Sequence, residues 1–291
     1  MKLKHYANAD NNKAVIEGPH FPVEQCNKLF VAILAHDDID LTAELPDTIH
    51  LKYSQYELTQ CYRICFQLWQ EGVDRTLLGK IAETFYWHRC LDPEMQLAFK
   101  NMRAKFKHLR FAYMTCDTSH SYPDDFHRVV VKMGNLQDAY KHNDTYQMRR
   151  SAIFLRLLSI NFAFAFSTRH VRRLRPTTND SFRDYVKKEI HFLRLSLAQE
   201  HVTARMFHEM RKVISRQVAL YDNLKTLYPS LYHEKISRYL STINGLMGSL
   251  HDELIARHFD DSQDYDFHAF EVPAQVRQRL IALTEKYQPP L

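Results

Sequence analysis

A set of residues recurs in the sequence 108 positions further along; for example, Arg103 in the first copy corresponds to Arg211 in the second. In each copy an arginine lies in a basic stretch with helical periodicity, and an aspartate follows it 41 positions later. An internal repeat in a helical chain indicates duplicated units that pack together. We therefore expect an all-α fold of two related antiparallel four-helix bundles, packed around a basic central cleft. The matched residues are Phe99, Met102, Arg103, Tyr113 and Asp144 in the first copy, and Phe207, Met210, Arg211, Tyr221 and Asp252 in the second.

Composition restricts the classes of protein that the chain can belong to. Of its 291 residues, 45% are hydrophobic and 12% aromatic, which predicts a packed core and excludes a disordered chain. The chain has only six glycines, and neither G-x-G-x-x-G nor G-x-x-x-x-G-K-[ST] occurs in it. Those turns need glycine where backbone approaches phosphate, so we expect neither a Rossmann nor a P-loop enzyme. The formal net charge of +5, with 17 further histidines, is compatible with an anionic partner.

Cysteine usage and the absence of targeting signals predict a soluble cytoplasmic protein. The start, residues 1–12, is polar and does not look like a signal peptide. The most apolar run, residues 157–168, is too short to span a bilayer. The cysteines show neither a disulfide framework nor zinc spacing, so we expect free thiols, no metal and no cofactor. They are Cys26, Cys61, Cys65, Cys90 and Cys116.

Periodicity predicts helices over most of the chain and a division into three parts. Residues 1–69 form an N-terminal extension with short helices. Residues 70–257 hold repeat 1 (about 70–168) and repeat 2 (about 178–257). Residues 258–291 combine an acidic linker, 258–271, with a C-terminal helix. The expected helices are 23–36, 54–70, 73–90, 94–117, 123–142, 145–168, 180–199, 201–227, 230–257 and 273–287.

Each repeat carries a stripe of basic residues on one face of a predicted helix. In the first, Lys100, Arg103, Lys107 and Arg110 are spaced i, i+3, i+7 and i+10; in the second, His208, Arg211, Lys212 and Arg216 are spaced i, i+3, i+4 and i+8. A single stripe is typical of a solvated helix face. Two stripes that meet in one cleft would repel each other unless an anion lay between them. We therefore interpret these eight residues as a polyanion site, with His208 alternatively a buried histidine hydrogen-bonded within its bundle.

Other residues are predicted to support this site. The opposite faces of the same helices are apolar and should lie in the core; they carry Phe99, Met102, Phe106, Leu109 and Tyr113 in one repeat, and Phe207, Met210, Ile214 and Tyr221 in the other. Arg149, Arg150, Arg172 and Arg173 are candidates for the rim. Asp144 and Asp252, expected near helix C-terminal ends, either orient basic side chains or are ordinary surface carboxylates.

At these positions the sequence resembles the conserved histidine α-helical domain (CHAD) family, over roughly residues 70–257. Family helices carry a pattern close to H-x-x-R-x-x-x-[KR]-R-L-R-[YF], followed by L-Q-x-x-L-G-x-x-[HN]-D. The first repeat matches these with Lys100-Asn101-Met102-Arg103, Lys107-His108-Leu109-Arg110-Phe111 and Leu136-Gln137 through Asn143-Asp144. The second matches them with His208-Glu209-Met210-Arg211-Lys212, Arg216 and Ile243-Asn244 through His251-Asp252.

The resemblance implies two four-helix bundles with a basic cavity that binds inorganic polyphosphate without catalysis, in a protein associated with polyphosphate granules. No E-x-E-x-K signature is present, so the resemblance is to a stand-alone member. The sequence departs from the pattern where Lys100 replaces histidine. It also departs where Ser215, Gln217 and Val218 replace the expected residues of the second copy, which therefore carries less charge.

Three other classes of function stay open at this point. His36-Asp37 and His251-Asp252 are compatible with a metal-dependent phosphohydrolase. Basic residues interleaved with aromatics are compatible with RNA binding. The charge lost from the second motif is compatible with a helical interaction scaffold whose cleft has degenerated. A further hypothesis is that the acidic segment 258–271 folds over a basic cleft and competes with its ligand.

Overall fold

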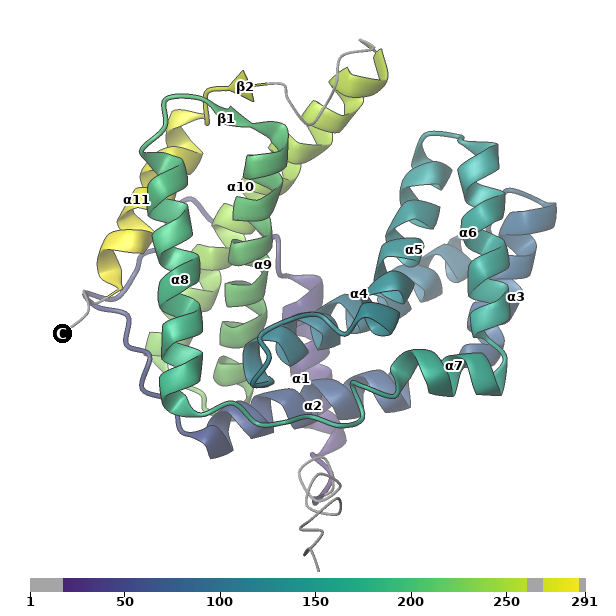
Figure 1. The fold of residues 1–291 in the computed structure, drawn as a ribbon, viewed down its shortest axis with the longest axis horizontal. Coiled ribbons are helices and arrows are strands. Elements are labelled where there is room, and N and C mark those ends of the chain that lie inside the picture. The colour runs from purple at the N-terminus through teal and green to yellow at the C-terminus, as the bar shows by residue number, and fades with distance from the viewer. Residues whose placement is uncertain (1–17, 261–268, 288–291) are drawn as a thin grey trace, which may run out of the picture. The chain divides into compact units, whose positions relative to one another are not determined.

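Helices make up most of the structure. The computed structural model describes residues 18–260 and 269–287, and of residues 255–260 only the backbone. Eleven helices and one two-stranded sheet account for the regular structure of this part, so the all-α class is confirmed (Figure 1). Its contacts divide it into two units. Unit 1 comprises residues 18–26 and 58–177, and unit 2 comprises residues 27–57, 178–260 and 269–287.

Unit 1 is built from six consecutive helices. They are α2 (Gln55–Gly72, from residue 58 onwards), α3 (Arg75–Trp87), α4 (Pro93–Cys116), α5 (Asp124–Lys141), α6 (Thr145–Leu158) and α7 (Asn161–Thr168). Three of them begin at an aspartate whose carboxylate accepts a hydrogen bond from a backbone N–H of the first turn: Asp74, Asp92 and Asp144. Such N-caps satisfy amide groups that have no partner within the helix. α6 packs against both α3 and α5.

Aromatic rings around Trp69 form the centre of unit 1. The Trp69 ring is stacked on Phe164, with their centroids 5.7 Å apart and their planes 3° from parallel. Phe106 and Phe126 meet the same indole edge to face, at 5.6 and 5.9 Å. All four side chains are buried. Such aromatic contacts contribute beyond the area they bury, so this cluster fixes α2, α4, α5 and α7 together.

The single helix predicted over residues 145–168 is wrong, because the chain breaks between α6 and α7. The two helices make an angle of 94°. At the break the Ser159 hydroxyl donates to the Arg156 carbonyl oxygen (2.7 Å). A serine bonded back to its own helix competes with the next backbone hydrogen bond. Gly79 of α3 lies against this serine, since a Cβ at Gly79 would come 2.8 Å from the Ser159 Oγ.

A buried carboxylate fixes the basic linker that follows α7. Asp117, at the end of α4, accepts hydrogen bonds from the backbone N–H groups of Ser119 (2.9 Å) and Arg175 (2.8 Å). It also accepts one from the Arg175 guanidinium (3.1 Å). Burial acts to raise the pKa of Asp117, but these hydrogen bonds outweigh it and the pKa is lowered. The charged carboxylate therefore holds residues 117–119 and 175 together.

Unit 2 contains the remaining helices and the small sheet. Its helices are most of α1 (Val23–Leu34), α8 (Asn179–Leu197), α9 (Ala204–Leu227), α10 (Leu231–Asp260) and α11 (Ala274–Lys286). The strands β1 (Val202–Thr203) and β2 (Ala269–Phe270) pair antiparallel, with Val202 opposite Phe270. α9 packs most extensively against α10, and α8 contacts both α9 and α11.

The loop between α1 and α2 is held against α10. Asn244 of α10 donates through its side-chain amide to the His36 carbonyl oxygen (3.0 Å). One residue further, Gly245 lies so close to the Asp37 backbone that an added Cβ would come 2.2 Å from the carbonyl oxygen. Glycine is the residue that permits this approach of two backbones. The loop between α1 and α2 is therefore part of unit 2.

The observed units divide the chain differently from the three predicted parts. Residues before 70 belong to both units, whereas the boundary at 177/178 falls between the two predicted repeats. Within the acidic segment 258–271, residues 261–268 lie outside the described part of the chain. The same holds for residues 1–17 of the predicted N-terminal extension.

The structure agrees with the expected free thiols, and it contains an apolar helix pair of interest. All five cysteines fall in the described part of the chain and are free thiols, with Cys61 and Cys65 buried one turn apart on α2. In this same part, no single helix combines the length and the apolar character needed to cross a bilayer. α6 and α7 reach both only when they are taken together as a bent pair.

Candidate anion-binding site

The two helices that carry the predicted basic stripes are α4 and α9, each 24 residues long. α4 begins at Asp92 with Pro93 in its first turn, and α9 begins at Thr203, whose hydroxyl accepts a hydrogen bond from the Met206 N–H (3.2 Å). Their apolar faces are buried as predicted, which confirms the core stripes. On α4 these are Phe99, Met102, Phe106, Leu109 and Tyr113; on α9 they are Phe207, Met210, Ile214 and Tyr221.

In each unit the repeated arginine lies against a glycine of the helix that follows. A Cβ added at Gly134 of α5 would come 3.4 Å from an Nη atom of Arg103. A Cβ added at Gly248 of α10 would come 3.0 Å from an Nη atom of Arg211. Both guanidinium groups are half-buried. The two glycines are 114 positions apart and the two arginines 108, so the glycines do not occupy matching positions of the repeat.

Aromatic rings and a histidine hold the end of the α4 stripe. Arg110 donates to the Nδ1 of His127 (3.2 Å), and its guanidinium lies over the rings of Phe111 (5.1 Å) and Tyr122 (4.8 Å). Because arginine can only donate, this contact requires an unprotonated Nδ1 on His127. Lys107 also contacts the Phe111 ring, with its Nζ 5.7 Å from the ring centre. These cation–π contacts orient both cations without neutralising them.

The outer part of the α9 stripe forms a cluster of three basic groups. The imidazoles of His208 on α9 and His251 on α10 are stacked, with centroids 4.9 Å apart. Burial lowers the pKa of His251, and the charges of Arg211 and His208 lower it further, to about 3. His251 is therefore neutral at physiological pH, first because it is buried and second because Arg211 and His208 lie beside it. The sequence pattern missed His251 as a member of this cluster, although it ends the second family-like motif.

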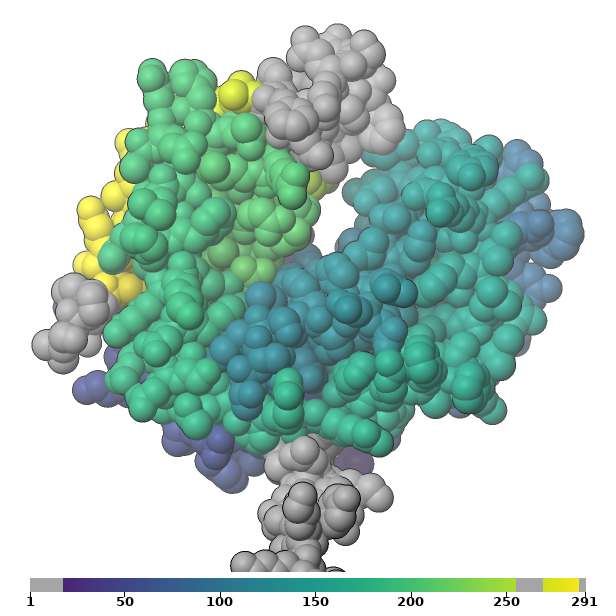
Figure 2. Space-filling model, in the orientation of Figure 1, coloured from purple at the N-terminus to yellow at the C-terminus, as the bar shows by residue number. Residues whose placement is uncertain are grey.

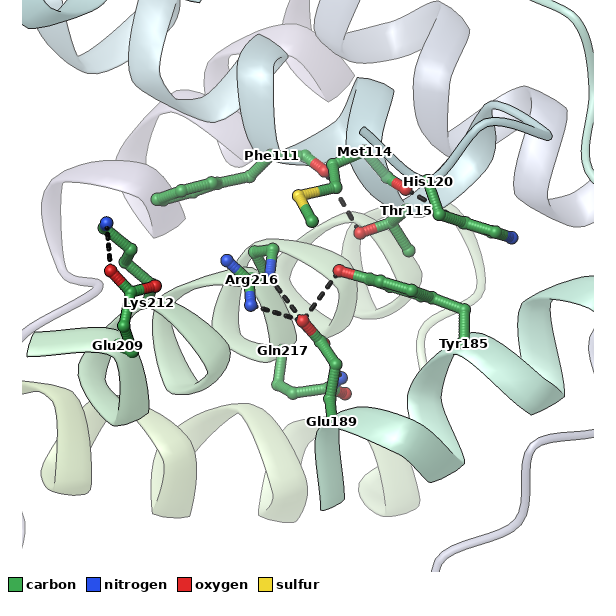
Figure 3. A network of polar contacts seen from close by, with 10 residues as sticks. All are labelled: Phe111, Met114, Thr115, His120, Tyr185, Glu189, Glu209, Lys212, Arg216 and Gln217. Atoms are coloured by element: carbon green, nitrogen blue, oxygen red, sulfur yellow. Dashed lines mark hydrogen bonds and ion pairs between the residues drawn. The ribbon is translucent and has the colours of Figure 1, made fainter. Parts of the chain in front are cut away.

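The inner end of the α9 stripe is neutralised within unit 2. Arg216 is buried and forms an ion pair with Glu189 of α8, with its Nε donating to Oε1 (2.6 Å) (Figure 3). Tyr185 donates its hydroxyl to the same oxygen (2.7 Å) and Gln217 donates to Oε2 (3.3 Å). These three partners of the buried carboxylate come from α8 and α9. Sequence reasoning missed Glu189 because it lies on another predicted helix, outside both motifs.

Lys212 also has an acidic partner, but a more exposed one. Its Nζ donates to Glu209 Oε1 (2.7 Å), one turn earlier on α9 (Figure 3). Pairs of this kind contribute little to stability, since water solvates both charges. A phosphate oxygen can therefore take the place of Glu209 at small cost. Of the eight predicted site residues, Lys100 is exposed, Arg216 is buried and the other six are half-buried.

The four predicted rim arginines lie in unit 1. Arg149 and Arg150 are exposed on α6, with Arg149 over the Tyr86 ring (5.8 Å). Arg172 and Arg173 are exposed in the linker after α7. Arg172 lies over the Trp69 ring (5.7 Å) and lines a cavity of about 300 Å³ together with Arg75, Asn161 and Phe164. These four residues lie on two different segments of unit 1.

The expectation that both aspartates lie near helix C-terminal ends holds for Asp144, which closely follows the end of α5 at Lys141, and is wrong for Asp252. Asp144 precedes α6 and caps it by accepting a hydrogen bond from the Gln147 N–H (3.0 Å). This capping role accounts for an aspartate at position 144, because its carboxylate satisfies a backbone N–H that has no partner within the helix. Asp252 is exposed and lies inside α10, which continues to Asp260.

Two further findings bear on the classes of function. Over the residues that the structure describes, no three histidine, cysteine or acidic side chains converge in a way that could hold a metal ion. Comparison of the chain with family models, with curated proteins and with solved structures gave no match. The resemblance to the CHAD family therefore stays a prediction.

Replacing the two paired cations of α9 should have unequal effects on stability. Arg216→Gln leaves the carboxylate of Glu189 buried without its counter-charge, so we expect the free energy of unfolding to fall by about 3–5 kcal/mol. Lys212→Gln removes the exposed pair and should cost less than about 1 kcal/mol. Denaturant unfolding of both variants measures this difference. Equal losses would contradict the structural role of Arg216.

The neutral state of His251 should make stability depend on pH. The folded-state pKa of about 3 is below the ordinary histidine value of 6.5, so at acidic pH the unfolded chain binds more protons. The free energy of unfolding should therefore fall as pH decreases from about 6.5 towards 3. His251→Gln should remove this component, whereas replacing the exposed His191 with Gln should keep it. Denaturant titrations across this range test the assignment, and an unchanged pH profile in His251→Gln would refute it.

Proposed function

We propose that this chain binds inorganic polyphosphate, or a similar extended polyanion, through α4 and α9 and without catalysis. The observation that supports this most directly is the cluster of His208, Arg211 and His251 in unit 2. There, neighbouring positive charge contributes to keeping His251 unprotonated. A phosphate beside this cluster would offset its charge and favour the protonated form of both histidines. The cluster thus gains stability from an anion.

The proposed ligand contacts come from the half-buried and exposed cations. In unit 1 they are Lys100, Arg103, Lys107 and Arg110, and in unit 2 His208 and Arg211, joined by Lys212 once phosphate displaces Glu209. Arginine donates two parallel hydrogen bonds to phosphate oxygens, and lysine supplies a point charge. Arg216 stays with Glu189 and positions α9. Arg149, Arg150, Arg172 and Arg173 attract the polyanion from a distance.

The proposal includes the internal duplication and the basic cleft that the sequence predicts. It takes the two units as related four-helix bundles of the CHAD type, in which a long polyanion engages both sets of cations. The matched residues Phe99, Met102 and Tyr113 of α4 are buried as Phe207, Met210 and Tyr221 of α9 are, and this common core stripe supports the duplication. Association with polyphosphate granules would follow from such binding.

Removing the repeated arginine from both units should abolish most of the binding. Each charge-assisted contact contributes about 1.5–3 kcal/mol, so Arg103→Gln with Arg211→Gln should weaken binding of long-chain polyphosphate by roughly 100-fold or more. Wild-type binding should also weaken steeply with salt, because cations bound to the polyanion are released. Isothermal titration calorimetry at low and high salt measures both effects.

A matched control separates specific contacts from loss of net charge. Arg128→Gln with Lys188→Gln removes the same charge from exposed positions on α5 and α8, and should reduce affinity only slightly. If the two double variants bind equally well, Arg103 and Arg211 are not in the site. Tighter binding of single-stranded RNA than of polyphosphate in direct competition would overturn the proposed ligand.

A further inference from the structure

Unit 1 exposes a run of large apolar side chains at the junction of α6 and α7. Phe162 is 81% exposed, and the other four members are between 47% and 56% exposed. In Figure 2, which keeps the orientation of Figure 1, the region of α7 lies at the surface of the molecule. We call this set the apolar patch; it consists of Ile153, Leu157, Ile160, Phe162 and Phe166.

The apolar patch is distinct from the core-facing side of the same helix. Phe164 and Thr168 of α7 are buried, and Phe164 is stacked on Trp69. Phe162 and Phe166 are one turn apart, on the opposite side, and face solvent. Single exposed apolar residues are common, but five along one short segment indicate a surface that binds a membrane or another molecule.

Cations border the apolar patch. The Arg169 guanidinium lies 3.7 Å from the Phe166 ring centre and also pairs with Asp125 (2.7 Å). Arg156 lies within α6 between two patch residues, with Glu83 at 3.7 Å. The linker after α7 adds Arg172 and Arg173, both exposed, but Arg172 lies over Trp69 on the core-facing side. The segment 153–173 thus carries four arginines and no acidic residue, and Arg156 and Arg169 are the cations at the patch itself.

We propose that the apolar patch docks on an anionic lipid surface. In this arrangement Phe162 and Phe166 enter the boundary between headgroups and acyl chains, while the bordering arginines contact lipid phosphates and carboxylates. Short helices with aromatic residues on one face and basic residues beside it bind membranes in this way. A second copy of the chain fits the patch less well, because a twofold interface would bring its arginines against each other.

This site is separate from the proposed polyphosphate site. The patch residues lie on α6 and α7, and the polyphosphate contacts lie on α4 and α9. The proposal replaces the sequence-based expectation that the protein has no membrane partner. Its failure would leave polyphosphate binding unaffected, and the converse also holds.

Flotation with lipid vesicles tests the proposal on the full chain. Wild-type protein should float with vesicles that contain phosphatidylserine, and much less with vesicles of phosphatidylcholine alone. Phe162→Ser with Phe166→Ser should lower the partition coefficient by roughly tenfold, because it removes two inserted rings. Arg156→Gln with Arg169→Gln, which leaves the rim arginines of the polyphosphate site in place, should weaken binding to anionic vesicles only.

Two controls keep the outcome decisive. Trp87→Ser with Leu97→Ser removes exposed apolar residues of α3 and α4, and should float like wild type. The Phe162 and Phe166 double variant should keep wild-type helicity and polyphosphate affinity. The proposal is overturned if wild type does not float or shows no preference for phosphatidylserine. It is also overturned if the double serine variant floats equally well, or if that variant instead breaks up a dimer of wild type.

Discussion

The ion pair between Glu189 and Arg216 is the interaction on which the arrangement of unit 2 depends. A cation in the interior is stable only beside a counter-charge with its remaining hydrogen-bonding positions filled. Tyr185 and Gln217 complete that set around Glu189, so α8 and α9 are fixed in one register. The half-buried end of the same stripe, at His208 and Arg211, is positioned as a consequence.

The two basic helices therefore use their charges in different ways. α9 uses the inner part of its stripe for structure and leaves Arg211 and His208, with His251 of α10, as the basic cluster. α4 holds its cations by aromatic rings and by His127, which orient Arg110 and Lys107 while preserving their charge. Both arrangements keep cations preorganised, which lowers the cost of binding a polyanion.

Sequence periodicity predicted much of the fold, because the core stripes of α4 and α9 alternate with polar residues at the helical period. It failed at the break after α6, which depends on the hydroxyl of Ser159 and on contact with Gly79 of α3. It also failed to find Glu189, whose importance comes from a contact 27 positions away in the chain. Single-helix patterns identify which residues share a face, but they do not show which charge on another helix neutralises them.

Proton uptake on binding tests the account most directly. Titration of long-chain polyphosphate into the protein at mildly acidic pH, in two buffers of different ionisation enthalpy, gives the number of protons taken up per binding event. If the anion lies beside His208, Arg211 and His251, the wild-type protein should take up protons, and His251→Gln should take up fewer. Binding without any proton uptake in the wild-type protein would contradict the placement of the ligand at this cluster.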